Sequence, residues 1–477
     1  MARILVLGAT GYIGGRLVPR LILAGHPVRC LVRSPRKLAA RHWPGVEIVE
    51  GDALRPEALW TAMKDIEVVY YLIHSLHAGE KRFAELDKKA AGNVAEAARV
   101  AGVKRIIYLG GLGKRGVEKS AHLKSRHEVG DILRSSGVPV TEFRAAVIIG
   151  SGGVSFEMMH HLVNRLPVMI CPKWIFVKTQ PISVRDVLHY LVECLHVPQS
   201  RERVIDIGGP DILSYGDMMK IIARVLGLKR RFIPIPLLSP RLSSYWINWV
   251  TPIPASIART LIESLRSETI CENEEAKQLF HFHLTPFEDS VRRSLGKISM
   301  HRVETKWTDA GLPFEKEEEE EIDPSHFLRD VRIHEAKVPA EKLFVLIQSI
   351  GGENGWYASD WLWRTRGFID QQIGGVGLRR GRRHPVEIAV GDALDFWRVE
   401  DFVPNQRLLL RAEMKVPGEA WLEFLAEPHD DTHSRLTQIA RFYPRGLAGL
   451  LYWYGLYPLH KLIFRGMARE IIRRAEK

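Results

Sequence analysis

The first half of the chain alternates short apolar runs with stretches whose apolar positions recur at helical spacing. Runs of strand length lie at residues 4–7, 27–33, 46–53, 68–74, 104–109 and 138–149. Between them, residues 17–22, 56–63 and 83–101 have the three-to-four-residue spacing of amphipathic helices. Strands that alternate with helices in this way predict an α/β fold with a doubly wound parallel sheet.

Three glycines, Gly8, Gly11 and Gly14, separate the first strand from the first helix. Gly8 can make the tight turn, Gly11 lets a phosphate approach the main chain, and Gly14 lets the helix lie close to the strand. The helix points its N–H groups and positive dipole end at the same place. This order predicts a dinucleotide site formed by Gly8, Thr10, Gly11, Tyr12, Ile13 and Gly14. The alternative is a glycine-rich turn without a ligand.

Basic residues follow the second predicted strand, where dinucleotide-binding proteins hold the adenosine ribose. An NAD-binding protein usually has an acidic residue here that bonds the ribose 2′-OH. This chain has Arg33, then Arg36 and Lys37, and no acidic residue. Cations at this point suit a 2′-phosphate, so NADP(H) is favoured and NAD(H) is the alternative. The same bases are otherwise solvated surface residues.

Two more strand ends supply candidate cofactor contacts. Asp52 and Ala53 follow the third predicted strand, where Asp52 is placed to face the adenine. His74 ends the fourth strand, and ligands of parallel sheets lie at the carboxyl ends of the strands. We therefore include these three residues in the predicted cofactor site.

The glycine pattern, the Gly51-Asp52 pair and the helix around residues 93–98 resemble the extended and atypical short-chain dehydrogenase/reductases. The resemblance is to the branch that includes nucleoside-diphosphate-sugar-epimerase-like, NmrA-like and complex I accessory-subunit-like proteins. It implies a Rossmann-type domain with a small substrate subdomain over residues 1–299. It also implies a nicotinamide dinucleotide as cofactor.

The catalytic pattern departs from that family. Active members carry a Ser or Thr after the fifth strand and a Tyr-x-x-x-Lys pair on the next helix. Here that strand ends in glycines, and His122 and Arg126 stand in the Tyr and Lys positions on one helix face. Arg126 stays charged and can bond a ribose or phosphate, and His122 can relay a proton near neutral pH. One interpretation is an oxidoreductase or epimerase-like enzyme that uses His122; the other is a non-catalytic NADPH-binding scaffold or redox sensor.

Composition limits which partners, metal sites and cellular locations are expected. The formal net charge of +12 allows attraction to anionic cofactors or lipids, and no nucleic-acid-binding motif is present, so no nucleic-acid partner is expected. The four cysteines are scattered, and the adjacent His160 and His161 would point about 100° apart on a helix, so no metal site is expected. Without a signal peptide or an apolar run of about 18 residues, a cytoplasmic protein is expected.

After an acidic run at residues 315–321, which predicts a solvated linker over 300–325, the pattern changes. A strand at 330–338 and a helix at 340–350 precede period-two segments at 386–390, 393–399, 407–414, 421–426 and 436–442. A helical pattern interrupted at Pro458 closes the chain. This order predicts an α+β helix-grip domain over 326–477, similar to the START and polyketide-cyclase superfamily. Phrases at 351–357, 374–383, 391–398 and 444–449 also resemble a bacterial domain of unknown function that follows an atypical short-chain-dehydrogenase domain.

Two segments of this second domain carry open interpretations. The arginines of residues 379–383 form either an anion clamp or a solvated loop paired to Asp392 and Asp395. The apolar, aromatic run at 447–459 is either an interfacial helix on the inner face of a membrane or the packed core helix, which we favour. The START-like resemblance implies a cavity for an apolar or quinone-like small molecule.

Overall fold

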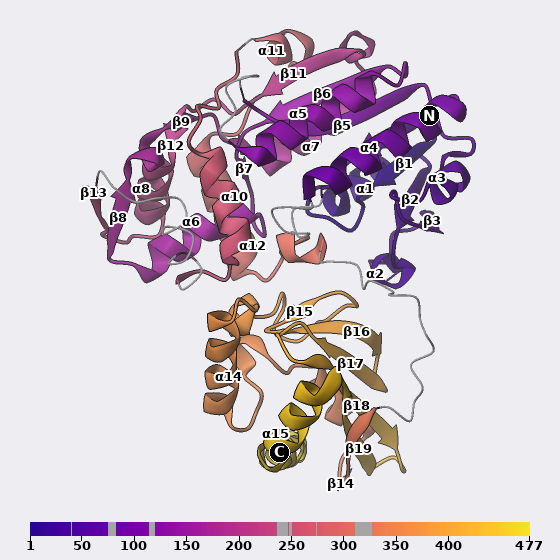
Figure 1. The fold of residues 1–477 in the computed structure, drawn as a ribbon, viewed down its shortest axis with the longest axis vertical. Helices are drawn as coiled ribbons and strands as arrows, with labels where there is room; N and C mark the ends of the chain where they lie inside the picture. Colours follow the sequence, from indigo (N-terminus) through magenta and orange to yellow (C-terminus); the bar gives the residue numbers. More distant parts are fainter. Residues whose placement is uncertain are drawn as a thin grey trace. The chain divides into compact units, whose positions relative to one another are not determined.

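The computed structural model describes residues 1–39, 41–74, 83–113, 120–235, 247, 250–272, 274–310 and 327–477. The chain divides into two compact units, Met1–Pro313 and Phe314–Lys477. The first unit contains a parallel sheet and the second an antiparallel one (Figure 1). The acidic run predicted at 315–321 lies outside the described residues.

The first unit is built on a seven-stranded parallel sheet in the order β11-β6-β5-β4-β1-β2-β3. Its strands are β1 (Ile4–Leu7), β2 (Val28–Val32), β3 (Glu47–Glu50), β4 (Val68–Tyr71), β5 (Arg105–Gly111), β6 (Val140–Ala145) and β11 (Arg203–Ile207). The strand order reverses at β1, whose neighbours are β2 and β4. Such a reversal opens a crevice at the carboxyl ends of the strands, where ligands bind. The predicted doubly wound parallel sheet is confirmed.

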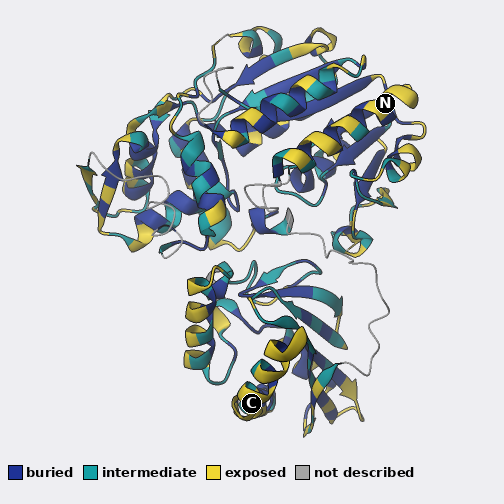
Figure 2. Ribbon diagram, in the orientation of Figure 1, coloured by how far each residue is buried: buried dark blue, intermediate teal, exposed yellow. Residues whose placement is uncertain are grey.

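Helices cover both faces of this sheet, because neighbouring strand residues point to opposite sides. Along β1, Ile4 and Val6 belong to one buried cluster, and Leu5 and Leu7 belong to the other. The first cluster includes α1 (Gly14–Leu23), α7 (Val184–Glu193) and α11 (Glu275–Leu279), and the second includes α3 (Pro56–Met63), α4 (Phe83–Val100) and α5 (Ala121–Arg134). A short α2 (Pro35–Ala39) follows β2. Figure 2 shows the central strands of the sheet buried between these layers, whereas the edge strand β3 is mostly exposed.

A smaller subdomain with its own core completes the first unit. Its helices are α6 (Val154–Arg165), α8 (Tyr215–Val225), α10 (Ala255–Ser264) and α12 (Phe287–Ser299). Its paired short strands are β7 (Ile148–Ile149) with β10 (Ile182–Ser183), β8 (Val168–Pro172) with β13 (Arg231–Ile235), and β9 (Lys178–Thr179) with β12 (Leu213–Ser214). Single-turn helices are η2 (Lys173–Phe176) and η3 (Pro198–Ser200). As predicted, Ser214 caps α8, accepting a hydrogen bond of 3.1 Å from the Asp217 N–H.

Residues 303–310, which we call the return segment, fold back from α12 onto the glycine turn and end in η4 (Trp307–Ala310). The Thr305 hydroxyl accepts a 2.7 Å hydrogen bond from Arg16 Nε and donates one of 2.8 Å to the Tyr12 carbonyl. Arg16 Nη2 donates to the Ser151 carbonyl at 2.7 Å. The return segment was assigned to the linker from sequence, yet it is part of the packed first unit.

The second unit is a six-stranded antiparallel sheet in the order β14-β19-β18-β17-β16-β15, with a long C-terminal helix. Its strands are β14 (Leu328–Ala336), β15 (Ala393–Leu394), β16 (Trp397–Val403), β17 (Arg407–Ala412), β18 (Gly418–Pro428) and β19 (Ser434–Pro444). Its helices are α13 (Ala340–Gln348), η6 (Gly352–Asn354), α14 (Asp360–Gln372), η7 (Gly377–Arg380) and α15 (Gly446–Ala475). Pro458 lies inside α15 without ending it.

One predicted strand is wrong, because residues 386–390 form irregular structure. His384 Nδ1 accepts hydrogen bonds from the N–H groups of Val386, at 3.2 Å, and Glu387, at 2.8 Å. This local turn uses two donors that a sheet ladder would need.

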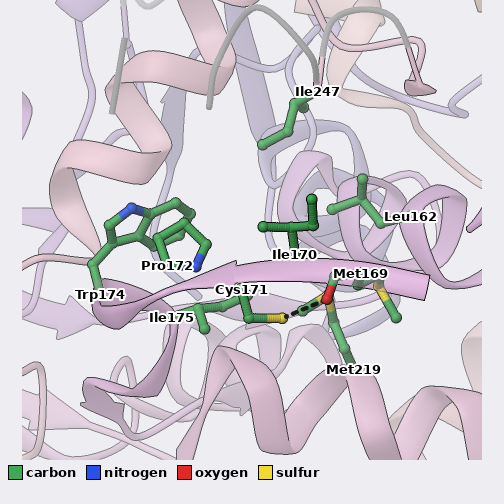
Figure 3. Close-up of a pocket in the computed structure, with 9 residues that line it drawn as sticks. All are labelled: Leu162, Met169, Ile170, Cys171, Pro172, Trp174, Ile175, Met219 and Ile247. Atoms are coloured by element: carbon green, nitrogen blue, oxygen red, sulfur yellow. Dashed lines mark hydrogen bonds between the residues drawn. The ribbon is translucent and has the colours of Figure 1, made fainter. Parts of the chain in front are cut away.

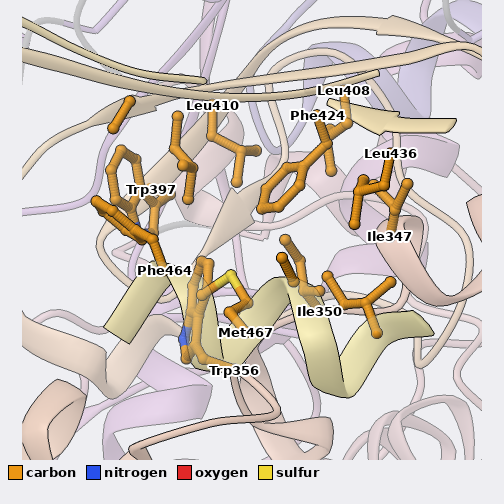
Figure 4. Close-up of a cluster of buried hydrophobic side chains, with 14 of the residues drawn as sticks. Ile347, Ile350, Trp356, Trp397, Leu408, Leu410, Phe424, Leu436, Phe464 and Met467 are labelled. Carbon is orange, nitrogen blue, oxygen red and sulfur yellow. The ribbon is translucent and has the colours of Figure 1, made fainter. Parts of the chain in front are cut away.

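Large side chains fill the space between the antiparallel sheet and α15 (Figure 4). Phe464 and Met467 of α15 belong to one buried cluster with Leu410 and Phe424 of the sheet. Aromatic rings are concentrated at one end of this cluster: Trp356 and Trp363, for example, have ring centroids 5.1 Å apart. The unit is therefore stabilised by a continuous aromatic and aliphatic core.

The arginine cluster is bonded within the second unit. Arg383 pairs with Asp392 at 3.1 Å, as one of the two interpretations expected. Arg380 and Arg398 both pair with Glu413. Burial alone would raise the pKa of Glu413, but these two guanidiniums outweigh it and lower that pKa to about 2. These contacts favour the paired interpretation over an anion clamp.

Asp370 supplies a stability prediction. Its fully buried carboxylate accepts hydrogen bonds from the N–H groups of Gly377, at 2.9 Å, and Lys415, at 2.7 Å, so it connects α14 to two loops. Asp370→Ala leaves both donors buried and unpaired and is expected to lower the free energy of unfolding of the second unit by about 2 kcal/mol. Urea unfolding followed by tryptophan fluorescence measures this change. The exposed Asp431→Ala is the control, with an expected change below about 0.5 kcal/mol; equal effects of the two substitutions would contradict the assignment.

Candidate functional site

The glycine turn after β1 is shaped as the sequence predicts for a phosphate site. Gly8 has a φ of +91°, and a Cβ there would lie 2.7 Å from the Leu72 carbonyl oxygen. A Cβ on Gly14 would lie 2.2 Å from the Gly8 carbonyl oxygen, so α1 can approach β1 only with glycine at this position. By contrast, a Cβ on Gly11 would meet only the Gly8 oxygen, at 3.3 Å, and space lies open beyond it. Among the described residues, no side chain caps α1 at Ile13.

The basic end of the site contains one residue that the sequence did not indicate. Arg33 is exposed where β2 ends, and Lys37 lies on α2. Arg41 crosses the glycine turn, where its Nη2 lies 3.4 Å from the Thr10 carbonyl oxygen and 3.4 Å from Asp309 of the return segment. Nothing in the local sequence marks Arg41, since its place depends on the return segment.

The predicted adenine side of the crevice is held by short polar contacts. Asp52 accepts a hydrogen bond of 2.9 Å from the Leu54 N–H, which fixes the turn after β3. The Ala53 carbonyl accepts a hydrogen bond of 3.0 Å from Asn93 Nδ2 on α4. Both residues therefore lie in a fixed loop at the carboxyl edge of the sheet.

The buried hydroxyl of Tyr12 tests whether the site suits an added group. This oxygen has no hydrogen-bond partner in the described part of the chain. Cβ atoms on Gly150 and Gly153 would lie 2.5 and 3.1 Å from it, so it points to the glycine-rich turn after β7. Burial raises the pKa of Tyr12, which keeps the hydroxyl protonated. A buried donor without a partner among the described residues, next to the glycine turn after β1, is compatible with a polar group bound there.

His122 is the centre of a hydrogen-bonded row of four side chains. Its Nε2 lies 3.0 Å from Nε2 of His74, and the two rings have centroids 4.9 Å apart. His74 Nδ1 lies 3.2 Å from the Asp87 carboxylate. On the other side, His122 Nδ1 lies 3.4 Å from the Ser264 hydroxyl, whose single proton has the Thr260 carbonyl, at 3.0 Å, as its other acceptor. The structure thus joins the predicted residues His74 and His122 to two that sequence reasoning missed.

The row has a preferred arrangement of protons. The Asp87 carboxylate accepts the Nδ1 proton of His74, so neutral His74 offers the lone pair of its Nε2. The Nε2–H of His122 donates to that lone pair. Burial lowers the pKa of His74, an effect that Asp87 opposes. Burial, then His74 and Arg126, lower the pKa of His122 well below its usual value, so both imidazoles are neutral at pH 7.

Arg126 holds the strand ends beneath this row. Its guanidinium donates to the carbonyl oxygens of Ile73, at 3.2 Å, and Leu109, and it lies over the Tyr108 ring at 4.8 Å. The Tyr108 hydroxyl in turn donates to the Arg126 carbonyl at 2.8 Å. Arg126 therefore ties α5 to the carboxyl ends of β4 and β5, next to His122.

The sequence contains a signal for Asp87 but none for Ser264. On α4, Phe83, Asp87, Ala90 and Val94 are all buried, so Asp87 is an acidic residue within an apolar stripe. Such an acid requires a buried polar partner. Ser264 is the last residue of α10 and is separated from His122 by 142 positions along the chain. Only the tertiary fold brings it to the site.

An apolar pocket lies in the smaller subdomain, between α6, β8 and α8 (Figure 3). Its lining residues are Leu162, Met169, Ile170, Cys171, Pro172, Trp174, Ile175, Met219 and Ile247. Within the described residues, no group of histidine, cysteine or acidic side chains is arranged to hold a metal ion. The rings of His160 and His161 have centroids 5.5 Å apart, and His160 stacks on Phe156.

Comparison with known families divides the chain in the same two parts. Residues 1–278 match the model of the NmrA-like family. Residues 324–467 match the model of a protein family of unknown function, DUF2867.

Individual relatives cover the first part. The chain is 24% identical over 308 residues to photosystem II assembly factor Ycf39 of Guillardia theta, covering 62% of this chain and 95% of that protein. It is 29% identical over 234 residues to ceramide reductase of Caulobacter vibrioides, covering 48% and 73%. Among solved structures, the Citrobacter sp. triphenylmethane reductase complexed with NADP(H) superposes with a TM-score of 0.50 at 22% identity, covering 61% of this chain and 99% of that one. This last likeness concerns the fold.

Proposed function

Because the chain belongs to the NmrA-like family, we propose that its first unit is an NADPH-dependent reductase in which His122 supplies the proton. The observation that carries the proposal is the row Asp87–His74–His122–Ser264 at the carboxyl edge of the sheet. Each nitrogen of His122 has one partner, His74 or Ser264, and His74 is itself bonded to the Asp87 carboxylate, so a second imidazole and an acid are coupled to His122. Coupled groups of this kind store and return a proton.

The glycine turn, the open N-terminus of α1 and Arg33 would hold the nucleotide. Gly11 leaves room for the pyrophosphate, and the first N–H groups of α1 would bond its oxygens. Arg33, with Lys37 and Arg41 nearby, provides cations for a 2′-phosphate, which favours NADP(H) over NAD(H). Asp52 and Ala53, in the loop after β3, and Tyr12, in the glycine turn, complete the proposed cofactor site. When bound, NADPH supplies a hydride.

His122 would complete the reduction of a double bond by adding one proton. A protonated His122 donates one N–H to His74 and the other toward Ser264, and the second of these is the proton that it can give up. After this loss, His122 is the neutral imidazole that its lowered pKa favours, and His74 and Asp87 hold it in place. One hydride and one proton balance the reduction.

The substrate is proposed to be apolar, including quinone-like molecules. The pocket of Figure 3 is lined almost entirely by apolar side chains and lies in the subdomain that the resemblance assigns to the substrate. One of the sequence relatives is named ceramide reductase, and ceramide is a lipid. Both observations support this substrate class.

Anaerobic titration with NADPH and with NADH, followed by consumption of bound NADPH with quinone and aldehyde panels, tests the proposal. Tight NADPH binding and steady oxidation are expected. Tight binding with no oxidation across the panels would favour the second candidate, a scaffold or redox sensor that holds the nucleotide without turnover. No binding of either nucleotide would overturn both.

Arg33→Ser is expected to weaken NADPH binding about tenfold and to leave NADH binding unchanged, because only NADPH carries the 2′-phosphate that a guanidinium would pair with. Parallel titrations with the two nucleotides measure the ratio of dissociation constants. Arg99→Ser, at the exposed end of α4, is the matched control. An equal loss for both nucleotides would place Arg33 outside the 2′-phosphate site.

For the second unit we propose a helix-grip arrangement, similar to the START superfamily. Its antiparallel sheet and α15 share one buried cluster, which supports this arrangement. The side chains of Figure 4 already occupy the interior, so the proposal assigns no ligand there.

A further inference from the structure

The two halves of α15 differ in burial. From Ile463 onward, its residues at helical spacing are buried in the core of the second unit. In the first half only Gly449 and Trp453 are buried, while Leu447, Leu451 and Tyr454 are 72%, 66% and 64% exposed. The interpretation of 447–459 as a packed core helix is therefore wrong for its outward side chains.

The exposed residues form one stripe along α15 that changes character along the axis. Successive outward positions are Leu447, Leu451, Tyr454, Pro458, Lys461, Arg465 and Arg469, spaced by three or four residues. The stripe is apolar and aromatic over its first three turns and basic over the rest.

The basic half of the stripe has no acidic counterpart. Residues 446–469 contain no aspartate or glutamate. In the described part of the second unit, no carboxylate pairs with Lys461, Arg465 or Arg469, whereas the sheet residues Arg407 and Arg411 each pair with a glutamate. These three cations are thus available to an anionic partner.

The stripe suits a partner that offers an apolar layer to its first half and anionic groups to its second half. A second copy of the chain does not offer this: antiparallel helices would place the apolar half against the basic half, and parallel helices would bring like charges together. The apolar run of 447–459 covers about 20 Å, less than the roughly 30 Å of a bilayer core. None of the helices in the described residues meets the length and hydropathy needed to cross a membrane.

From these observations we propose that α15 docks the second unit on an anionic lipid bilayer. Leu447, Leu451 and Tyr454 enter the interface between headgroups and acyl chains, and Lys461, Arg465 and Arg469 pair with lipid phosphates. The docking is independent of the nucleotide chemistry proposed for the first unit.

Flotation of the full chain with vesicles of phosphatidylcholine and phosphatidylglycerol tests this docking. Leu447→Glu/Leu451→Glu changes two exposed residues and is expected to reduce the vesicle-bound fraction about tenfold or more. Leu23→Glu, at an exposed leucine of the first unit, is the matched control and is expected to bind like the unmodified chain. The proposal would be overturned if the double variant bound the vesicles as fully as the unmodified chain. It would also be overturned if the unmodified chain did not bind.

The charge half of the proposal has its own test. Lys461→Glu/Arg465→Glu is expected to lower binding to the anionic vesicles about tenfold, and added salt is expected to weaken the unmodified chain. Equal binding to vesicles of phosphatidylcholine alone would contradict the role of the basic residues. Light scattering without lipid tests for a dimer. A dimer that Leu447→Glu/Leu451→Glu dissociates would contradict the proposal, because a second copy of the chain would then cover the stripe.

Discussion

Gly11→Val is expected to weaken NADPH binding about 100-fold or more while the first unit stays folded. The Cβ of Gly11 would meet only the Gly8 oxygen, at a tight 3.3 Å, so a shift of a few tenths of an ångström admits the side chain, whereas the pyrophosphate would collide with it. Fluorescence titration with NADPH measures the affinity, and thermal unfolding measures the stability of the same sample.

Substitutions at two other glycines distinguish a loss of nucleotide affinity from a loss of stability. A Cβ at Gly14 would overlap main-chain atoms, so Gly14→Val is expected to lower the unfolding temperature as well as the affinity. Gly92 lies in α4 with open space around it, and Gly92→Ala is expected to leave binding unchanged and to stabilise the helix by up to about 1 kcal/mol. Unchanged NADPH affinity in Gly11→Val would remove the glycine turn from the nucleotide site.

His122→Ala is expected to reduce NADPH oxidation by about 10²- to 10⁴-fold, the range for loss of a general acid, with little change in NADPH affinity. Single-turnover oxidation with an accepted substrate measures the rate, and titration measures the affinity. His429→Ala, at an exposed histidine of the second unit, is the control. A parallel loss of affinity and rate in His122→Ala would instead mark a cofactor contact without chemistry.

The rate of NADPH oxidation is expected to rise as the pH falls. Because burial, then His74 and Arg126, lower the pKa of His122, its protonated form is scarce at pH 7. A rate that needs this form rises as the pH falls, by about tenfold per pH unit above the pKa. Asp87 raises the pKa values of both histidines, so Asp87→Asn is expected to move the rise to lower pH and to lower the rate at pH 7. An unchanged profile would show that Asp87 only supports the fold.

Sequence periodicity predicted the parallel sheet and the glycine turn because both are local: a strand, three glycines and a helix lie within twenty residues. It missed α14, whose apolar residues surround the helix, with Trp363 buried and Trp361 and Phe368 exposed, and so give no single stripe. In the site, the buried stripe of α4 marks Asp87 as an acid in need of a partner, whereas Ser264 could not be predicted, since it reaches His122 through tertiary packing alone.

The pairing of charged side chains was only partly predictable from the sequence. The arginines of 379–383 have the composition of an anion clamp; the alternative of pairing named Asp392, which does bond Arg383, but not Glu413, the distant partner of Arg380. A run of like charges gives the number of cations without their partners. Only a structure shows which cations, such as Arg380 and Arg383, are bonded to carboxylates and which, such as Lys461, are not bonded to one among the described residues.

The return segment determines where the chain can be cut. A fragment ending at residue 299 would lose Thr305, and Arg16, only 1% exposed, would keep its charge in the interior with fewer acceptors. Such a deficit costs about 1–3 kcal/mol. The residues that bury Arg16 also contact the Tyr12 carbonyl, so a protease that clips before the return segment would damage the nucleotide turn. A cleavage after it would release the first unit with that turn complete.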